Sequence, residues 1–318
     1  MARRGAIGLG LGLAVLAGCA AGSGTTDRTW ASARSGSASS AGSTAQAIWT
    51  PWPAGSVAVI PIPTALPSEI TYDQAMRFFQ YDRSRPFDIK ETAADVVDGA
   101  TVDDITYVGA AGTRCQANLV LPTGQGPFGG VMYLHGAGGS SSDFLPEATA
   151  LAGRGVASLL ITQPEAQKVP GDGNAAVTEI VYEMREMGRA MDLLASRPEV
   201  DPSRLGFVGF SFGAVRGATF AGFQGGRLKI AVLASTPPSY DTPAMAPFDP
   251  IVWVSYVSPA ALYIQEGKLD TWFTHDEAEA LIGVARDPKR LVWYDANHGL
   301  DGNAYDDRLA WLGDALGN

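Results

Sequence analysis

The chain has few of the residues that build disulfide scaffolds or nucleic-acid surfaces. Its 318 residues include two cysteines and three histidines, and 33 acidic residues outnumber 23 basic ones, for a formal net charge of −10. No cluster of lysine and arginine occurs in the body of the chain, so no nucleic-acid partner is expected. With 46% hydrophobic and 18% charged residues, the chain can bury one sizeable core and is compatible with a single α/β domain.

The first apolar run is short. Ala6–Leu16 is too short for a comfortable transmembrane helix, and after Arg3 and Arg4 it has the layout of a secretion signal. The Leu-Ala-Gly-Cys stretch that follows resembles the lipobox of bacterial lipoproteins. This resemblance implies a lipid on Cys19 and an extracytoplasmic protein that meets a bacterial membrane only through that anchor. An ordinary signal peptide with a coincidental cysteine is the alternative.

Composition divides the chain into three segments. We expect a lipoprotein signal peptide over 1–18, a flexible tether rich in Ser, Ala and Gly over 19–47, and a globular domain over 48–318. If Cys19 carries lipid, Cys115 has no disulfide partner. Cys115 alternates with apolar residues, which predicts a buried structural thiol on a strand.

Short apolar runs alternate with amphipathic stretches along the globular part. The expected strands are Ile105–Val108, Ala117–Leu121, Val131–Leu134, Ser158–Ile161, Leu205–Phe210, Ile230–Ala234, Ala261–Gln265 and Leu291–Tyr294. The expected helices are Phe144–Arg154, Thr178–Ser196, Phe212–Phe223, His275–Ala285 and Ala304–Leu316. This alternation predicts an α/β fold with a mostly parallel central sheet of about eight strands, covered by helices on both faces. Short links favour antiparallel pairing of the first strands.

Residues 209–213 read Gly-Phe-Ser-Phe-Gly, a G-x-S-x-G nucleophile elbow between a predicted strand and a predicted helix. This turn holds Ser211 in a strained backbone conformation that lifts its hydroxyl clear of the sheet. Side chains at positions 209 and 213 would collide with neighbouring backbone, so both positions need glycine. The N–H of Phe212, at the helix N-terminus, is then free to face a developing oxyanion.

The three histidines make the search for a base short. A serine hydroxyl is a poor nucleophile until a base takes its proton and an acid holds that base. In enzymes with this elbow the chain order is serine, acid, histidine, with the base after the last strand. His298 fits this order. His275 is interpreted as a solvated residue at a helix start, and His135 ends an early strand.

The acid is expected at the end of the second strand after the nucleophile helix. There Asp270 comes three residues after Gly267, in a turn that projects one carboxylate toward the histidine loop. Glu266, Asp276 and Asp295 are the competing carboxylates, and each is interpreted as a surface charge.

The second oxyanion donor is expected in the small, flexible loop His135-Gly136-Ala137-Gly138-Gly139. We assign the N–H of Ala137, paired with that of Phe212. The alternative interpretation of this loop is a phosphate cradle, but it lacks the lysine and the spacing of a P-loop.

These residues carry a resemblance. His135-Gly136, Gly209–Gly213, Asp270 and His298 together resemble the α/β-hydrolase superfamily. Further stretches resemble its dienelactone-hydrolase-like branch, which includes acetyl-esterase-like members: Tyr81-Asp82 with Pro86 and Asp88, Ala195–Pro202, and Asp307–Leu312. The similarity covers roughly residues 70–316. Dienelactone hydrolases proper use a cysteine nucleophile, so Ser211 argues for ordinary ester hydrolysis.

Aromatic residues lie close in sequence to the assigned groups. Trp272 and Phe273 follow the acid turn, and Phe210 stands where related esterases often carry histidine, which predicts an apolar substrate pocket. Only a short segment separates the strands 230–234 and 261–265, so no large lid domain is expected. The predicted substrate is a small-molecule or polymeric ester with a short or medium acyl group or an aromatic group.

The predicted reaction is acyl transfer through an acyl-enzyme. Ser211 is the nucleophile, His298 is the base and Asp270 orients that base, so the reaction needs no metal or organic cofactor. Two alternatives stay open: a serine peptidase or amidase of the same fold, and a non-catalytic surface binding protein.

Overall fold

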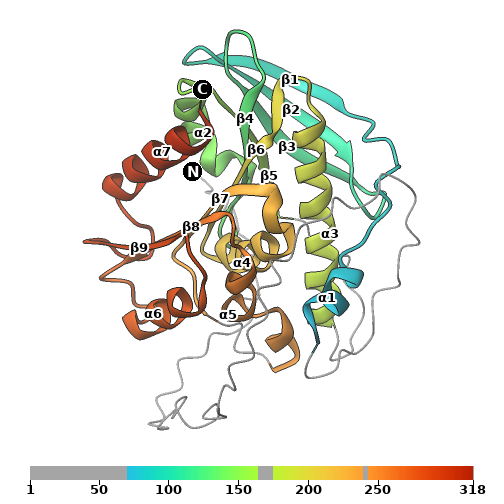
Figure 1. Ribbon diagram of the computed structural model, residues 1–318. Coiled ribbons are helices and arrows are strands. Elements are labelled where there is room, and N and C mark those ends of the chain that lie inside the picture. Colours follow the sequence, from blue (N-terminus) through green and yellow to red (C-terminus); the bar gives the residue numbers. More distant parts are fainter. Residues whose placement is uncertain (1–69, 164–174, 239–242, 318) are drawn as a thin grey trace, which may run out of the picture. The chain divides into compact units, whose positions relative to one another are not determined.

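The computed structural model describes residues 70–163, 175–238 and 243–317 (Figure 1). The predicted signal segment 1–18, the lipidation candidate Cys19 and the rest of the tether to residue 47 lie outside the described residues. The described part forms one nine-stranded sheet with helices packed against both faces.

The sheet has the spatial order β1-β2-β3-β5-β4-β6-β7-β8-β9. Its strands are β1 (Lys90–Val97), β2 (Ala100–Val108), β3 (Arg114–Leu121), β4 (Phe128–Leu134), β5 (Val156–Ile161), β6 (Val200–Phe210), β7 (Leu228–Ala234), β8 (Ala261–Gly267) and β9 (Lys289–Tyr294). All neighbours from β5 to β9 pair parallel, whereas β1, β2, β3 and β5 pair antiparallel with one another in turn. The mostly parallel sheet and the antiparallel first strands are therefore confirmed. The sequence patterns missed β1, because every one of its residues is exposed.

Helices cover the two faces of the sheet in two groups. The first group is α2 (Leu145–Ala152) and α7 (Gly302–Leu316). The second group is α1 (Tyr72–Phe78), α3 (Ala175–Ser196), α4 (Phe212–Gln224), α5 (Pro250–Trp253) and α6 (His275–Val284). Short 3-10 turns are η2 (Ser141–Phe144), η3 (Gly225–Arg227), η4 (Pro243–Phe248) and η5 (Val254–Tyr256). The five expected helices are all present, whereas α1 and the short α5 were not expected.

Helix α3 shows how burial follows from the sequence pattern. Ile180, Met184, Met187 and Met191 recur on one face of the helix, and all four are completely buried in the core shared with the sheet. These methionines are therefore core residues rather than part of a binding surface. The chain leaves α3 just before Pro198 and enters β6, the strand that leads to the serine elbow.

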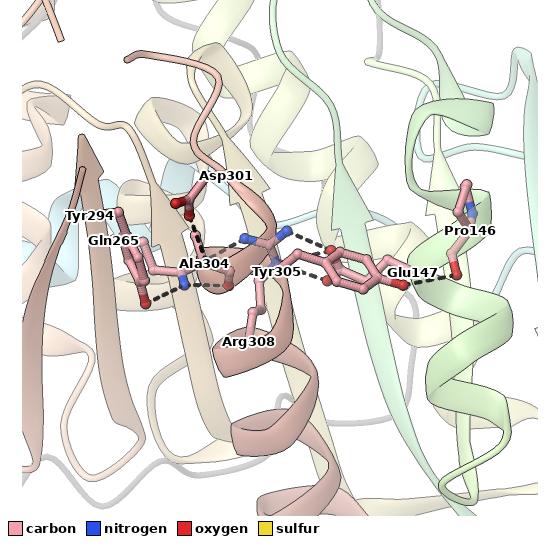
Figure 2. Close-up of polar contacts among 8 residues, drawn as sticks. All are labelled: Pro146, Glu147, Gln265, Tyr294, Asp301, Ala304, Tyr305 and Arg308. Carbon is pink, nitrogen blue, oxygen red and sulfur yellow. Dashed lines mark hydrogen bonds and ion pairs between the residues drawn. The ribbon is translucent and has the colours of Figure 1, made fainter. Parts of the chain in front are cut away.

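A buried polar cluster, here called the Arg308 clamp, joins α7 to α2 and to the sheet. It consists of Glu147, Gln265, Tyr294 and Arg308. Figure 2 shows the Arg308 guanidinium between the Glu147 carboxylate and the Gln265 side chain. Arg308 Nε donates to Glu147 Oε1 at 2.8 Å, and Nη1 donates to Gln265 Oε1 at 2.7 Å. Gln265 Nε2 in turn donates to the carbonyl of Ala304 and to Tyr294.

The topology brings the ends of four strands together. Strands β4, β6, β8 and β9 run parallel, so their carboxyl ends lie at one edge of the sheet, and the strand order reverses between the neighbours β4 and β6. Ligand sites of open α/β sheets form at such an edge. In the described ranges, no helix is both long and apolar enough to cross a membrane.

Candidate active site

The serine elbow has the strained geometry that the motif predicts. Ser211 precedes α4 with φ 51° and ψ −117°, a positive φ that a side-chain-bearing residue rarely adopts. A Cβ added to Gly209 would lie 2.3 Å from the carbonyl oxygen of Gly213. A Cβ added to Gly213 would lie 2.2 Å from that of Leu134. Backbone atoms therefore leave no room for side chains at either position, as expected.

Three side chains meet at the carboxyl edge in single file. His298 Nε2 lies 2.8 Å from Ser211 Oγ, and His298 Nδ1 lies 2.7 Å from Asp270 Oδ2. The Asp270 side chain is 2% exposed and the His298 side chain 21% exposed. A carboxylate can only accept, so Nδ1 carries the ring proton in the neutral imidazole. Nε2 is then the acceptor that faces the serine hydroxyl.

Backbone contacts hold the acid turn against the histidine loop. The N–H of Trp272 donates to Asp270 Oδ1 at 2.7 Å, so both carboxylate oxygens of Asp270 are engaged. The N–H of Leu269 donates to the carbonyl of Ala296 at 2.9 Å. These bonds fix Asp270 relative to the loop that carries His298.

Ser235 supports the loop that carries His298 and was not among the residues predicted from the sequence. This residue follows β7 with a positive φ of 54°, is completely buried, and its hydroxyl donates to the carbonyl of His298 at 2.7 Å. Its only sequence signal is its place directly after a strand that ends at the same edge of the sheet. That signal does not distinguish it from other residues that follow strands.

The two assigned oxyanion donors come from neighbouring elements. Phe212 is the first residue of α4, and the first N–H groups of a helix have no partner within it. Ala137 is exposed in the loop after β4, and its N–H makes no hydrogen bond to the described residues. A Cβ added to the adjacent Gly136 would lie 3.3 Å from Ser211 Cβ, so this loop passes directly beside the nucleophile.

His135 is a structural residue of that loop. It is 3% exposed, its Nε2 accepts the N–H of Gln163 at 2.9 Å, and its Nδ1 lies 2.7 Å from the carbonyl of Gly136. Because Nε2 accepts, Nδ1 carries the proton and donates to Gly136. The ring thus ties the loop after β4 to Gln163, two residues after the end of β5.

The three predicted pocket residues surround the imidazole of His298. Trp272 is stacked on it with a centroid distance of 5.6 Å, Phe273 meets it edge-on at 5.4 Å, and Phe210 lies 5.5 Å away. Trp272 is 68% exposed, so one face of the site presents an aromatic ring to solvent. Trp253, in contrast, is 2% exposed and packs in the core.

The interpretation of Glu266 as a surface charge was wrong. Its side chain lies at the end of β8, is 2% exposed, and accepts the N–H of Thr236 at 2.8 Å. Burial raises the pKa of Glu266 to about 8; the Thr236 N–H opposes this rise and the charge of Asp270 adds to it. Near neutral pH Glu266 is therefore mostly a neutral acid beside the Asp270 carboxylate. Asp295 is 86% exposed, as expected, and forms an ion pair with Lys268.

The remaining sequence candidates lie apart from this arrangement. His275 begins α6, is exposed, and packs its ring on Trp293. Cys115 is a free, half-buried thiol on β3, and burial raises its pKa to about 12, so the thiol stays protonated. Within the described residues, no three His, Cys, Asp or Glu side chains are grouped so that they could hold a metal ion.

Comparisons with known sequences find distant relatives. No family model matches the chain. Over 110 residues the chain is 33% identical to acyl-coenzyme A thioesterase 3 of Mus musculus, covering 35% of this chain and 24% of that protein. The chain thus spans about a quarter of the length of that relative. Over 251 residues it is 26% identical to the uncharacterized protein YfhR of Escherichia coli O157:H7, covering 74% of this chain and 82% of that one.

Comparisons with solved structures identify the fold. Acetyl xylan esterase 1 from Thermoanaerobacterium sp. JW/SL YS485 matches with a TM-score of 0.64 at 16% identity, covering 76% of this chain and 93% of that one. An S-formylglutathione hydrolase from Agrobacterium tumefaciens matches with a TM-score of 0.58 at 15% identity, covering 72% and 100%. At these identities the likeness concerns the fold. The chain has the α/β-hydrolase fold, and the part of it that the structure describes contains no large lid domain.

Proposed function

We propose that this protein is a serine hydrolase that cleaves carboxylic esters through an acyl-enzyme. The observation that carries the proposal is the single-file hydrogen bonding from Ser211 Oγ to His298 and from His298 to Asp270. In this arrangement the Asp270 carboxylate orients the imidazole ring, and the ring accepts the serine proton. The esterase and the hydrolase that share this fold support a hydrolytic function.

In the first step, Ser211 Oγ attacks the carbonyl carbon of the ester while its proton passes to His298 Nε2. The carbonyl π electrons move to the oxygen, and the N–H groups of Phe212 and Ala137 donate to that oxyanion. The imidazolium formed at this point is balanced by the Asp270 carboxylate. When the tetrahedral intermediate collapses, His298 protonates the leaving alcohol, and the acyl group stays on Ser211.

In the second step, water replaces the alcohol. His298 takes a proton from this water, whose oxygen attacks the acyl carbon and regenerates an oxyanion in the same two-donor site. Collapse breaks the bond to Ser211 Oγ, and His298 returns the proton to the serine. The cycle releases a carboxylic acid and an alcohol, and besides water it uses only groups of this chain.

The proposed substrate carries a short or medium acyl group or an aromatic group, in a small molecule or on a polymer. The aromatic rings around His298 offer apolar contact at the reacting centre. A serine member of the dienelactone-hydrolase-like branch remains our assignment within the superfamily. A thioester is a second candidate substrate, favoured by the acyl-coenzyme A thioesterases that match about a third of the chain.

The decisive experiment combines one variant with a set of acyl donors. The purified protein is assayed on p-nitrophenyl esters of increasing acyl length, on thioesters with the same acyl groups, and on a p-nitroanilide. We expect hydrolysis of the short esters and its loss in Ser211→Ala, whose circular dichroism and melting temperature stay those of the wild type. Activity that persists in Ser211→Ala refutes the assignment, and preferred cleavage of the anilide identifies a peptidase or amidase.

For the cellular location, we also propose that Cys19 carries a lipid and holds the protein outside the cytoplasm on a bacterial membrane. The support is the Leu-Ala-Gly-Cys sequence after a short apolar run. Metabolic labelling with radioactive palmitate in a bacterial host should mark the wild type and spare Cys19→Ser, and detergent phase separation should move only the wild type into the detergent phase. Equal labelling of both proteins contradicts the proposal.

A further inference from the structure

A second buried glutamate–arginine pair lies directly behind the serine elbow. Glu183 on α3 and Arg216 on α4 form an ion pair between Arg216 Nε and Glu183 Oε2, with side-chain exposures of 1% and 4%. Arg216 Nη2 also lies 3.3 Å from Glu179 Oε1, a more exposed carboxylate on α3. The pair therefore joins α4 to the helix that packs beside it.

Arg216 reaches the first turn of α4, where one assigned oxyanion donor is located. Its guanidinium carbon lies 4.4 Å from the centre of the Phe212 ring. A guanidinium over an aromatic face is attracted by the negative potential of that face. Because Arg216 is itself held by Glu183, this contact fixes the side chain of Phe212, and with it the residue whose N–H is the proposed oxyanion donor.

The other oxygen of Glu183 leads to the second assigned donor. Gln163 Nε2 donates to Glu183 Oε1 at 3.2 Å, and the N–H of Gln163 donates to His135 Nε2 at 2.9 Å. His135 then donates from Nδ1 to the carbonyl of Gly136, the residue before Ala137. A continuous chain of polar contacts thus runs from the Glu183 carboxylate to the loop after β4.

We propose that Glu183 and Arg216 are positioning residues that set the separation between the two oxyanion donors, Phe212 and Ala137. This inference rests on the proposed function. The two oxygens of one carboxylate hold the two sides of the site: Oε2 binds the arginine under Phe212, and Oε1 binds the glutamine that leads to the Ala137 loop. An oxyanion site depends on such spacing, since a shift of about 1 Å in a positioned group can cost about a hundredfold in rate.

The energetic cost of the pair also favours a positioning role. A buried ion pair contributes little net stability compared with apolar side chains of similar volume, because the desolvation of two charges offsets their attraction. Elsewhere on α3, Met184 and Met187 pack as apolar residues in the core. The Glu183–Arg216 pair is therefore better explained by its contacts toward Phe212 and the Ala137 loop than by a contribution to stability.

The test compares Glu183→Gln with a control on the same helix. Glutamine keeps the volume and the acceptor for Gln163 but removes the charge that holds Arg216. Asp192 is the matched control, because it is 7% exposed, lies about 13 Å further along α3, and binds Tyr81 and Arg83 away from the elbow. Asp192→Asn therefore also removes a buried charge from α3, without touching the proposed chain of contacts.

The readouts are kcat and KM on a p-nitrophenyl ester and the inhibition constant of a trifluoromethyl ketone. Ser211 Oγ adds to the carbonyl carbon of this ketone, its proton moves to His298, and the resulting oxyanion occupies the oxyanion site. We expect Glu183→Gln to lower kcat by about ten- to a hundredfold with little change in KM. The ketone should bind weaker by the same factor, and Asp192→Asn should lower the melting temperature with kcat retained.

Three outcomes decide the matter. A folded Glu183→Gln protein with the kcat of the wild type overturns the inference while leaving the proposed function intact. An equal loss of kcat in Asp192→Asn also overturns it, because the loss then reflects general loosening. If Glu183→Gln does not fold, Arg216→Lys takes its place: it keeps the charge but loses the planar contact with Phe212, so kcat should fall and KM should not. Failure of the proposed function is seen separately, as absence of Ser211-dependent hydrolysis in the wild type.

Discussion

The carboxyl edge of the sheet and the Arg308 clamp both bury charged side chains, but they connect them in different ways. In the clamp, Arg308 binds Glu147 through two nitrogens and Gln265 through a third. At the carboxyl edge, Ser211, His298 and Asp270 are joined in single file by one contact each. Several bonds to one partner hold a group still, whereas the single-file arrangement leaves His298 free to accept the serine proton while Asp270 orients the ring. The first pattern stabilises the fold, and the second is the arrangement that the proposed hydrolysis requires.

The two buried glutamate–arginine pairs differ in how fully the glutamate charge is compensated. Burial lowers the pKa of Arg308, but the Glu147 carboxylate more than offsets this, so the net shift of the Arg308 pKa is upward and Arg308 stays charged. Burial raises the pKa of Glu183 to about 7 although Arg216 opposes the rise. Glu183 divides its two oxygens between Arg216 and Gln163, so neither partner compensates its charge as fully as Arg308 compensates Glu147.

The largest effect is expected from a substitution that breaks the single-file arrangement of Ser211, His298 and Asp270. Asparagine in Asp270→Asn presents an N–H group to His298 Nδ1, which favours the tautomer whose proton sits on Nε2 and faces Ser211. We expect kcat on a short p-nitrophenyl ester to fall by about 10⁴-fold, with little change in melting temperature. Asp276→Asn, which removes an exposed carboxylate near the start of α6, should keep full activity. Activity of Asp270→Asn within about tenfold of wild type would show that another group orients His298.

The next effect concerns the clamp and should appear in stability. Glu147→Gln leaves the buried Arg308 without its counter-charge, and breaking a buried pair in this way costs about 3–5 kcal/mol of unfolding free energy. Urea unfolding should detect this loss, while kcat at a temperature where the variant is folded should be unchanged. Glu199→Gln removes a partly exposed ion pair with Arg197, and its cost should not exceed about 1 kcal/mol. A fall in kcat for Glu147→Gln would mean that the clamp also shapes the site.

The two regions also differ in how far the sequence predicts them. Ser211, Asp270 and His298 each follow a strand with a recognisable apolar pattern, and parallel strands bring such positions to one edge. Their meeting was therefore predictable from order along the chain. Glu147 and Arg308 are far apart in sequence, and nothing local distinguishes them from surface charges, because their burial depends on the packing of α2 against α7.

Strand β1 and the burial of Glu266 were not predicted because both depend on contacts that form only in the folded chain. Strand β1 has no apolar alternation, since both of its faces are exposed, and only its pairing with β2 makes it a strand. Glu266 is an isolated glutamate before a glycine, a pattern typical of a surface turn. Its burial comes from Thr236 after β7 and from the Asp270 turn, which are brought together only in the folded chain.

The smallest expected effect is seen when the buried Glu266 at the carboxyl edge is compared with the exposed Asp295. Below pH 4.5 Glu266 is protonated in both the folded and the unfolded chain. As pH rises from 4.5 to about 8, the unfolded chain releases this proton first, because burial raises the pKa of the folded Glu266 from 4.5 to about 8. The folded state therefore loses stability across this window.

Glu266→Gln keeps the acceptor for Thr236 but cannot ionise. Its melting temperature should match that of the wild type near pH 4.5 and exceed it increasingly up to pH 8. At pH 8 the gain in unfolding free energy is on the order of a few kcal/mol. Asp295→Asn, which alters an exposed carboxylate, should differ from the wild type by an amount that changes little with pH. A difference for Glu266→Gln that is constant from pH 4.5 to 9 would mean that Glu266 is ionised in the fold throughout this range, and that both carboxylates of the acid turn are charged beside His298.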